Sequence, residues 1–269
     1  MYPVLFSIGP VHIYGYGFMI ALGILAAFFV AVKRAPKHGL DPDAVYSIGL
    51  AGAICGFIGA KLFFCIVEFP SFMADPAGIM FSGNGFVVYG GIIGGVLGGL
   101  GYCKKKGHDF LRYFDLIMPS IALAQGFGRI GCFLAGCCYG QKTDLPIGVV
   151  FTHSDLAPNG VKLIPTQLIS SAGDFIIAFA LIYLAGKIKE KGNIGLLYIA
   201  MYSIGRFAIE FFRADYRGSI GPLSTSQAIA IVACLVALLI FCWNRNRAKE
   251  KATSEDAAES AESTEDVEE

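Results

Sequence analysis

Seven stretches of apolar residues, each close to the length of a membrane-crossing helix, constrain this chain more than any other feature. They run over 14–32, 45–67, 86–103, 113–138, 168–186, 194–212 and 222–243. A helix needs about 20 mostly apolar residues to cross the hydrocarbon core of a bilayer. Hydrophobic residues make up 55% of the chain and charged residues only 16%, whereas a soluble domain gives much of its surface to water. The sequence therefore predicts an all-α integral membrane protein with about seven transmembrane helices.

The basic residues between these stretches predict which side each connection faces. The connections after the first, third, fifth and seventh stretches are rich in lysine and arginine, namely Lys33, Arg34 and Lys37; Lys104, Lys105, Lys106 and Arg112; Lys187, Lys189 and Lys191; Arg245, Arg247, Lys249 and Lys251. The intervening connections hold few basic residues, and 69–85 holds none. Cytoplasmic loops carry the excess of basic residues. We therefore expect the N-terminus outside and the C-terminus in the cytoplasm.

The end of the chain differs sharply in composition from the rest. After Lys251 the sequence carries eight acidic residues and no basic one. It has no hydrophobic period, which is typical of a segment that does not fold. We expect two parts: a polytopic membrane domain over 1–247 and an acidic, disordered cytoplasmic tail over 248–269.

Three basic residues lie inside the apolar stretches: Lys61, Arg129 and Arg206. Each costs about 2.5–3.5 kcal/mol near the bilayer centre on insertion scales. For Lys61, and for Arg213 at the end of the sixth stretch, a side chain that reaches the interface and one that meets a polar partner are equally acceptable. Small residues surround Arg129 and Arg206, so a polar cavity or a bound ligand is favoured for them over a structural ion pair.

The sixth stretch carries a polar stripe. Tyr202, Arg206, Glu210 and Arg213 are spaced four, four and three residues apart, which places them within about 80° of one another on a helix. Glu210 can pair with both arginines and lower the cost of burying them. A net positive charge remains, and the anion at hand in a membrane is a phospholipid phosphate, which arginine binds bidentately.

The third stretch is rich in glycine over Tyr89–Gly101. Close helix packing is the simpler explanation for Gly95 and Gly99. Gly90 and Gly91 follow a turn-like SGNG segment near the expected outer end of this helix, where they can admit a lipid head group close to the backbone.

Several motifs, in this order along the chain, resemble the prolipoprotein diacylglyceryl transferase family from Phe6 to about the end of the last stretch. FSIGPVHIYGYG is similar to its N-terminal segment, and YGGIIGG to its His-Gly-Gly-Leu-Ile-Gly motif. GRIGCFLAGCCYG resembles the signature Gly-Arg-x-Gly-Asn-Phe-x-Asn-x-Glu-x-x-Gly, and IPTQL resembles Pro-Ser-Gln-Leu. YSIGRFAIEFFR matches closely, and LSTSQ is similar to the Met-Gly-Gln start of the last helix.

The resemblance implies an enzyme that transfers the diacylglyceryl group of phosphatidylglycerol to the lipobox cysteine thiol of bacterial prolipoproteins, with release of glycerol 1-phosphate. This is the first step of lipoprotein maturation. The implied partners are phosphatidylglycerol, prolipoprotein signal peptides and the lipid bilayer of the bacterial cytoplasmic (inner) membrane. Nucleic acid is not expected as a partner, and neither a cofactor nor a metal is expected. The open alternatives are a diverged lipid transferase with another acceptor and a non-enzymatic membrane protein that binds or transports lipid.

Carried over residue by residue, the resemblance assigns two sets of site residues. The implied catalytic residues are Arg129, Arg206, Tyr89 and Tyr202. The implied phosphatidylglycerol-binding residues are Tyr16, Gly90, Gly91, Arg129, Gly140, Gln167, Arg206, Glu210 and Arg213.

The chain departs from the family pattern at two motifs. Tyr89 stands where the family has histidine, and no histidine lies in any predicted span, so an imidazole base is absent there. Tyrosine, with a reference pKa near 10, is a poor base, so Tyr89 is better suited to positioning the head group. Cys132, Ala135 and Cys137 replace Asn, Asn and Glu. For the cluster of Cys132, Cys137 and Cys138 we favour packing over an external-side disulfide, and either over a metal site, because C-x4-C-C is no recognised metal pattern.

Overall fold

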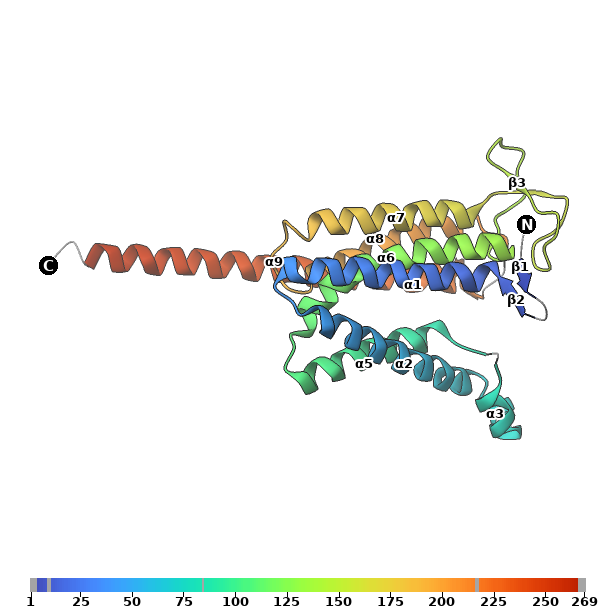
Figure 1. The fold of residues 1–269 in the computed structure, drawn as a ribbon. Helices are drawn as coiled ribbons and strands as arrows, with labels where there is room; N and C mark the ends of the chain where they lie inside the picture. Colours follow the sequence, from blue (N-terminus) through green and yellow to red (C-terminus); the bar gives the residue numbers. More distant parts are fainter. Residues whose placement is uncertain (1–3, 9–10, 84, 216–217, 266–269) are drawn as a thin grey trace. The chain divides into compact units, whose positions relative to one another are not determined.

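The computed structural model describes residues 4–8, 11–83, 85–215 and 218–265, and the chain divides into two compact units. One unit comprises Met1–Ala27 and Met118–Glu269, and the other comprises Phe28–Ile117. Each is described by itself below, with the elements labelled as in Figure 1.

Helices dominate both units. The longer ones among the described residues are α1 (Gly15–Arg34), α2 (Pro42–Val67), α5 (Val88–Lys106), α6 (Phe110–Ala135), α7 (Thr166–Leu184), α8 (Asn193–Glu210) and α9 (Thr225–Glu265). The short ones are the 3-10 helix Ala35–His38, α3 (Phe69–Ala74) and α4 (Pro76–Phe81). Three two-stranded hairpins pair β1 (Val4–Ile8) with β2 (Val11–Tyr14), β3 (Val149–Val150) with β4 (Lys162–Leu163), and β5 (Ser219–Ile220) with β6 (Leu223–Ser224).

Each long helix overlaps one of the predicted apolar stretches, which confirms the all-α character. Within the described ranges, five segments are long and apolar enough to cross a membrane: Gly15–His38, Pro42–Val67, Phe110–Ala135, Thr166–Leu184 and Thr225–Ala248. Helices α5 and α8 are not among them. Helix α5 combines many glycines with three lysines in its last turn, and α8 carries charged residues toward its C-terminal end, so both are less apolar than the others.

In the unit of Phe28–Ile117, glycines let α2 and α5 pack at close range. A methyl group on Gly98 would lie 2.7 Å from the Ala51 carbonyl oxygen, and one on Gly56 would lie 3.1 Å from the Gly91 carbonyl oxygen. Gly90 is buried against Gly59 in the same way. Close packing was the prediction for Gly95 and Gly99, yet methyl groups there would make ordinary contacts of 3.4–3.5 Å. The tightest approaches fall on a different face of α5.

Lys61 of α2 has polar partners inside its own unit. The side chain is buried, and Nζ donates to the backbone oxygen and to Oγ of Ser82, both at 2.9 Å. The rings of Phe64 and Phe86 also face the ammonium group. Of the two explanations left open by the sequence, the structure gives the polar partner.

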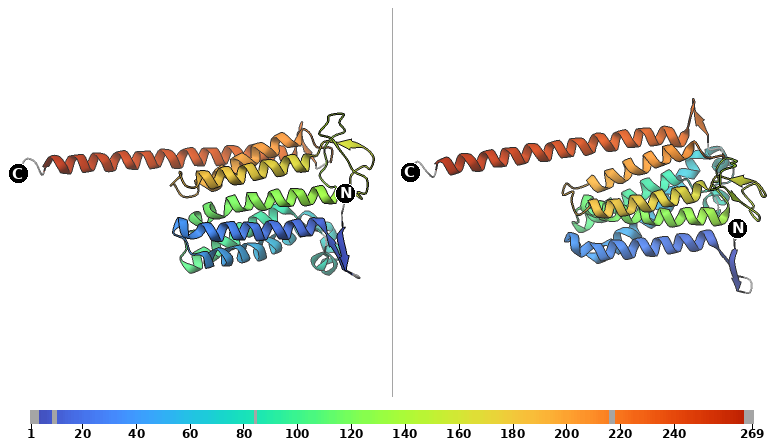
Figure 2. Two further views of the ribbon diagram at one scale, coloured as in Figure 1. Left: turned by 45° about the horizontal axis from the view of Figure 1, so that its top comes forward. Right: turned by 90° about the horizontal axis from the view of Figure 1, so that it is seen from above.

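In the unit of Met1–Ala27 and Met118–Glu269, residues of α6, α7 and α8 form one apolar core. Figure 2 shows the ribbons of these helices in two further views. Ala178 and Leu181 of α7 are fully buried there against Ala122 of α6. Hydrogen bonds fix the register of these helices. The Tyr198 hydroxyl of α8 donates to Oε1 of Gln125, and the Ser171 hydroxyl of α7 donates to the Gly126 carbonyl, both at 2.8 Å.

Helix α9 begins at a capping box and runs antiparallel to α8. The Ser224 hydroxyl accepts a hydrogen bond from the Gln227 backbone, and the Gln227 amide oxygen accepts one from the Ser224 backbone, which satisfies two amide groups that a helix N-terminus leaves open. About halfway along α9, Asn244 donates to Asn193 at the start of α8. Gln227, aligned with a family motif, therefore caps a helix.

Helix α9 continues past the last apolar residues through Glu265. The disorder expected over 248–269 stays a prediction. Residues 266–269 lie outside the described residues. The segment is rich in alanine and glutamate, both strong helix formers, so a polar sequence without a hydrophobic period extends the helix that precedes it.

Candidate active site

Arg129 of α6 and Tyr202 of α8 form the centre of the candidate site. The Arg129 Nη2 donates to the Tyr202 hydroxyl at 3.5 Å. A methyl group on Gly128 would meet no described atom within 4 Å, so the space next to the arginine is open as the sequence predicts. On the other side, Tyr16 in the first turn of α1 packs on Gly131, where a methyl group would lie 3.2 Å from its ring. The fold thus brings Tyr16, Arg129 and Tyr202 together.

Among the described residues, no carboxylate forms an ion pair with Arg129, and the nearest acidic influence is Asp174 of α7. Asp174 is only 4% exposed, and its Oδ2 has no hydrogen-bond partner in the described part of the chain. The two opposite charges attract each other across the gap, which lowers the cost of holding both in an apolar bundle. Sequence reasoning missed Asp174. Its signal is a single carboxylate within an otherwise apolar span.

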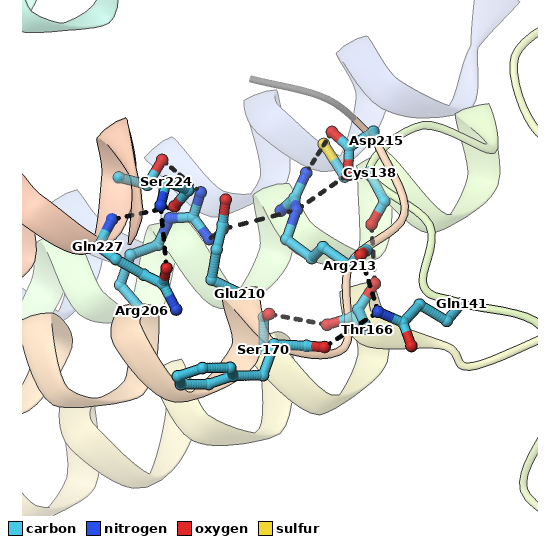
Figure 3. Close-up of polar contacts among 12 residues, drawn as sticks. Cys138, Gln141, Thr166, Ser170, Arg206, Glu210, Arg213, Asp215, Ser224 and Gln227 are labelled. Carbon is cyan, nitrogen blue, oxygen red and sulfur yellow. Dashed lines mark hydrogen bonds and ion pairs between the residues drawn. The ribbon is translucent and has the colours of Figure 1, made fainter. Parts of the chain in front are cut away.

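Arg206 has a protein partner on its own helix and another on α9. Its Nη1 pairs with the Glu210 carboxylate one turn along α8, and its Nη2 donates to the Ser226 hydroxyl at 2.9 Å. Figure 3 shows the two side chains of α8 turned toward one another. The predicted pairing of Glu210 with Arg206 is therefore present, and Arg206 is fixed by α9 as well.

Arg213 does not lie on the stripe of α8. The helix ends at Glu210, and the chain then turns so that Gly140 and Arg213 form an antiparallel bridge. Backbone bonds from Gln141 to Phe212 and from Ala214 to Tyr139 hold this bridge. The helical spacing predicted a fourth stripe position, but these backbone bonds to the 139–141 segment compete with the helix and end it.

Asp215 is the main partner of Arg213. The Nε and Nη2 atoms donate to its two carboxylate oxygens at 2.9 and 2.7 Å, a bidentate pair, whereas Glu210 lies 3.9 Å away. Burial lowers the pKa of Arg213, but the bonds to Asp215 and Cys138 outweigh it and raise the pKa above its ordinary value. Figure 3 shows the Cys138 sulfur beside this guanidinium. Sequence reasoning missed Asp215 because it follows the end of the helix.

Gln167 and Gly140 organise the connection between α6 and α7. The Gln167 amide donates to the Cys137 carbonyl at 2.7 Å, and the Thr166 hydroxyl donates to the Cys138 carbonyl at 2.8 Å. A methyl group on Gly140 would lie 2.8 Å from Cγ2 of Thr166, so this position has no room for a side chain. Gln167 is 1% exposed, and its Oε1 has no partner among the described residues. Both residues shape the loop beside the arginines.

Three thiols gather in this loop. The sulfur atoms of Cys132, Cys137 and Cys138 all lie within 4.8 Å of one another, and none of these cysteines is in a disulfide. Hydrogen bonds from Cys132 and Cys137, and from the Arg213 guanidinium, lower the pKa of Cys138 below its ordinary value. The cluster lies near Tyr16 and Arg129 as well. The sequence left packing, a disulfide and a metal site as explanations of this cluster. Packing alone does not require the three sulfur atoms to lie this close together.

The glycine-rich motif belongs to the other unit. Tyr89 stands in the first turn of α5, is 43% exposed, and its hydroxyl has no hydrogen-bond partner in the described part of the chain. Gly90 is buried in the packing of α5 against α2, and Gly91 makes ordinary contacts there. Close packing of two helices is therefore sufficient to explain glycine at position 90.

The site combines cations, phenols and thiols in one unit, which suits the binding of a phosphate ester. Arg206 is paired with the Glu210 carboxylate, whereas Arg129 has no carboxylate in ion-pair contact among the described residues. The Tyr202 hydroxyl accepts a hydrogen bond from Arg129, and the Tyr16 ring packs on Gly131 of the same helix. Preorganised cations in a dry site stabilise negative charge that develops on a departing group.

Comparison with known proteins gives one family. The chain matches the family described as Prolipoprotein diacylglyceryl transferase over residues 3–243. The phosphatidylglycerol--prolipoprotein diacylglyceryl transferase of Clostridium tetani is 48% identical over 247 residues, covering 92% of this chain and 99% of the relative. The second such transferase of Clostridium perfringens is 45% identical, with coverage of 92% and 97%. That of Staphylococcus carnosus is 34% identical, with 90% of each chain covered.

Proposed function

The chain belongs to the prolipoprotein diacylglyceryl transferase family, and from this premise we propose how its site performs the transfer. The substrates are phosphatidylglycerol and a prolipoprotein, and the reaction is the first step of lipoprotein maturation. The acceptor is the thiol of the lipobox cysteine, and glycerol 1-phosphate leaves. The enzyme is bacterial and multi-pass, and the proposal places it in the cytoplasmic (inner) membrane.

The state of Arg129 is the observation that carries the proposed mechanism. Its guanidinium has one long hydrogen bond to Tyr202, no carboxylate in ion-pair contact among the described residues, and open space beside Gly128. A partly buried arginine with unused donors in a membrane is costly, and a phosphate oxygen pair satisfies it bidentately. The lipid phosphate therefore supplies the acceptors that the Arg129 guanidinium lacks.

The remaining residues support the same phosphate. The acceptor sulfur attacks the glyceryl carbon, and the bond from that carbon to the phosphate oxygen breaks. Arg129 and Arg206 stabilise the charge that grows on the leaving phosphate, and Tyr16 and Tyr202 donate hydrogen bonds to the head group. Glu210 keeps Arg206 aligned. Gln167 and Gly140 shape the adjoining loop, and Arg213 supports that loop through Asp215.

Tyr89 and the two glycines after it stay in the proposal with a narrower role. Their part in binding the lipid rests on the family resemblance alone, with the exposed Tyr89 hydroxyl as the group that would contact a head group. For Gly90, packing against α2 is the better explanation.

The proposed topology has seven spans, with the N-terminus outside and the C-terminus in the cytoplasm. The seven long helices and the basic residues that follow α1, α5, α7 and the apolar part of α9 support it. The site then opens toward the external leaflet, and residues 248–269 extend into the cytoplasm. Single-cysteine labelling in a cysteine-free background should place 104–106 and 187–191 inside and 69–85 and 140–165 outside. Inversion at any of these loops contradicts the topology.

The function is tested with purified protein, phosphatidylglycerol vesicles and a synthetic lipobox peptide. We expect the peptide to gain the mass of one diacylglyceryl group and glycerol 1-phosphate to appear in equal amount. The matched control is the same peptide with serine in place of its cysteine, which should stay unmodified. If the cysteine peptide also stays unmodified with folded, lipid-bound protein, the proposed reaction is wrong.

A further inference from the structure

The three-thiol cluster has the geometry of a metal site. Cys132 lies in the last turns of α6, and Cys137 and Cys138 lie just after its end, with all three sulfur atoms within 4.8 Å of one another. Two cysteines bound tetrahedrally to one zinc ion, at about 2.3 Å each, are about 3.8 Å apart. The separations therefore need only small side-chain movements to bind one ion.

The loop that carries the cluster is fixed before any ion binds. The backbone carbonyls of Cys137 and Cys138 accept hydrogen bonds from the buried side chains of Gln167 and Thr166. The Cys137 amide bonds to the Cys132 carbonyl. Cys138 has φ +61°, the one positive value for a non-glycine residue in the described ranges. Such a backbone costs about 1–3 kcal/mol and persists only where the surrounding structure holds it. The hydrogen bonds of this loop therefore hold the three thiols close together.

The chemistry of the ligand set selects the ion. Thiolates prefer soft or borderline ions such as zinc, whereas magnesium and calcium prefer oxygen ligands. Structural zinc sites use four protein ligands, while sites with three protein ligands leave the fourth position for water or substrate. Guanidinium groups compensate the negative charge that three thiolates bring, since Arg213 contacts Cys138 and Arg129 is in electrostatic range of Cys132.

We propose that Cys132, Cys137 and Cys138 bind one zinc ion, whose open fourth position takes the acceptor cysteine of the prolipoprotein as its thiolate. This inference rests on the proposed function. On binding, the acceptor thiol loses its proton to solvent and its sulfur coordinates the zinc. The sulfur electron pair then forms the bond to the glyceryl carbon, and the phosphate leaves with the electrons of the broken carbon–oxygen bond. Neither an oxidant nor a reductant takes part.

This site supplies what the rest of the chain lacks. The sequence has no histidine in the predicted spans to act as a base for the acceptor thiol. Zinc replaces the base, because a coordinating thiol is deprotonated outright. The cluster is near Arg129 and Tyr16 and contacts Arg213, so the activated sulfur and the leaving phosphate meet in one unit.

Metal content tests whether the three cysteines bind zinc. Protein purified in detergent under reducing conditions, supplied with zinc and then desalted, should hold about one zinc ion per chain. Cys132→Ser and Cys138→Ser should each weaken zinc binding by about 10²-fold or more, whereas Cys242→Ser, an exposed thiol of α9, should not. Cobalt in place of zinc should give sulfur-to-metal charge-transfer absorption in the wild type and in Cys242→Ser alone. This spectrum is read on the folded fraction after gel filtration, so misfolding of one variant does not hide the result.

Two results overturn the proposal that the three cysteines bind zinc. One is equal zinc content in Cys132→Ser, Cys138→Ser and Cys242→Ser. The other is reduced wild-type protein that retains no zinc, including the case in which protein isolated without reductant carries a disulfide within the cluster.

Metal removal separates this inference from the proposed function. Chelator-treated wild-type protein should lose transfer to the lipobox peptide by about 10²–10⁴-fold, the usual contribution of acceptor deprotonation, and should regain it with zinc. Phosphatidylglycerol should still raise its melting temperature, since the arginines are unchanged. Full transfer without zinc overturns the inference and leaves the function standing. Zinc-loaded protein that never modifies the peptide overturns the proposed function while the metal site stands.

Discussion

Replacing Arg129 separates binding of the lipid phosphate from a structural role of this arginine. Arg129→Lys keeps the charge and loses the planar pair of donors. Hydrogen bonds to charged groups contribute about 1.5–3 kcal/mol, so the loss of one such bond to the departing phosphate should slow transfer by about 10–10²-fold. Arg129→Gln loses the charge as well and should slow transfer by about 10²–10³-fold, as for removal of one oxyanion donor.

The effect on stability should run in the opposite direction. The single hydrogen bond of Arg129 to Tyr202 is long, and among the described residues Asp174 offsets its charge from a distance without an ion-pair contact. Removal of a charge that costs about 2.5–3.5 kcal/mol in the bilayer should leave Arg129→Gln at least as stable as the wild type without added lipid. The stabilisation by phosphatidylglycerol should shrink in both variants.

Two assays on the same preparations decide the matter. One measures diacylglyceryl transfer to a lipobox peptide, and the other measures the detergent melting temperature with and without phosphatidylglycerol. Arg112→Gln serves as the control, because Arg112 bonds the His38 carbonyl in the other unit and has no part in the proposed site. If both Arg129 variants unfold while their folded fraction transfers at the wild-type rate, Arg129 is structural and the catalytic reasoning fails.

Three further substitutions test separate parts of the account. Tyr89→Phe should leave stability unchanged, because the hydroxyl has no partner among the described residues. It should lower transfer by about 10²–10⁴-fold, and near-normal turnover would assign this motif to packing. Asp174→Asn should enlarge the melting-temperature shift caused by phosphatidylglycerol, since the lipid then has no competitor for Arg129, and an unchanged shift refutes this pairing. Gly98→Leu should destabilise the protein by about 1–3 kcal/mol through overpacking against α2, whereas Gly101→Leu, with open space around it, should not; equal effects contradict the packing of α2 and α5.

The helical core of the site was predictable because helical spacing is local. Tyr202, Arg206 and Glu210 follow the period of α8 with one turn between them, and the structure joins Arg206 to Glu210 as expected. Arg213 obeys the same arithmetic, but it lies beyond the end of the helix, where backbone bonds to 139–141 decide its place. Spacing along one helix cannot reveal a backbone partner such as Gly140, which comes from a distant part of the chain.

The partners that sequence reasoning missed are tertiary. Asp174 attracts Arg129 from another helix, and Asp215, which follows the end of α8, forms an ion pair with Arg213. Neither relation leaves a periodic signal. Glycine shows the same limit: a run of glycines predicts that α5 packs closely against another helix, but the crossing geometry decides that Gly90 and Gly98 make the close approach. The convergence of the three thiols likewise depends on the loop after α6.

The most direct measurement is the structure of the protein with phosphatidylglycerol bound. The account predicts the lipid phosphate within hydrogen-bond distance of the Arg129 and Arg206 guanidinium groups, with the Tyr202 hydroxyl beside it. A head group bound only at the cytoplasmic surface, with Arg129 and Arg206 contacting protein groups alone, would contradict it.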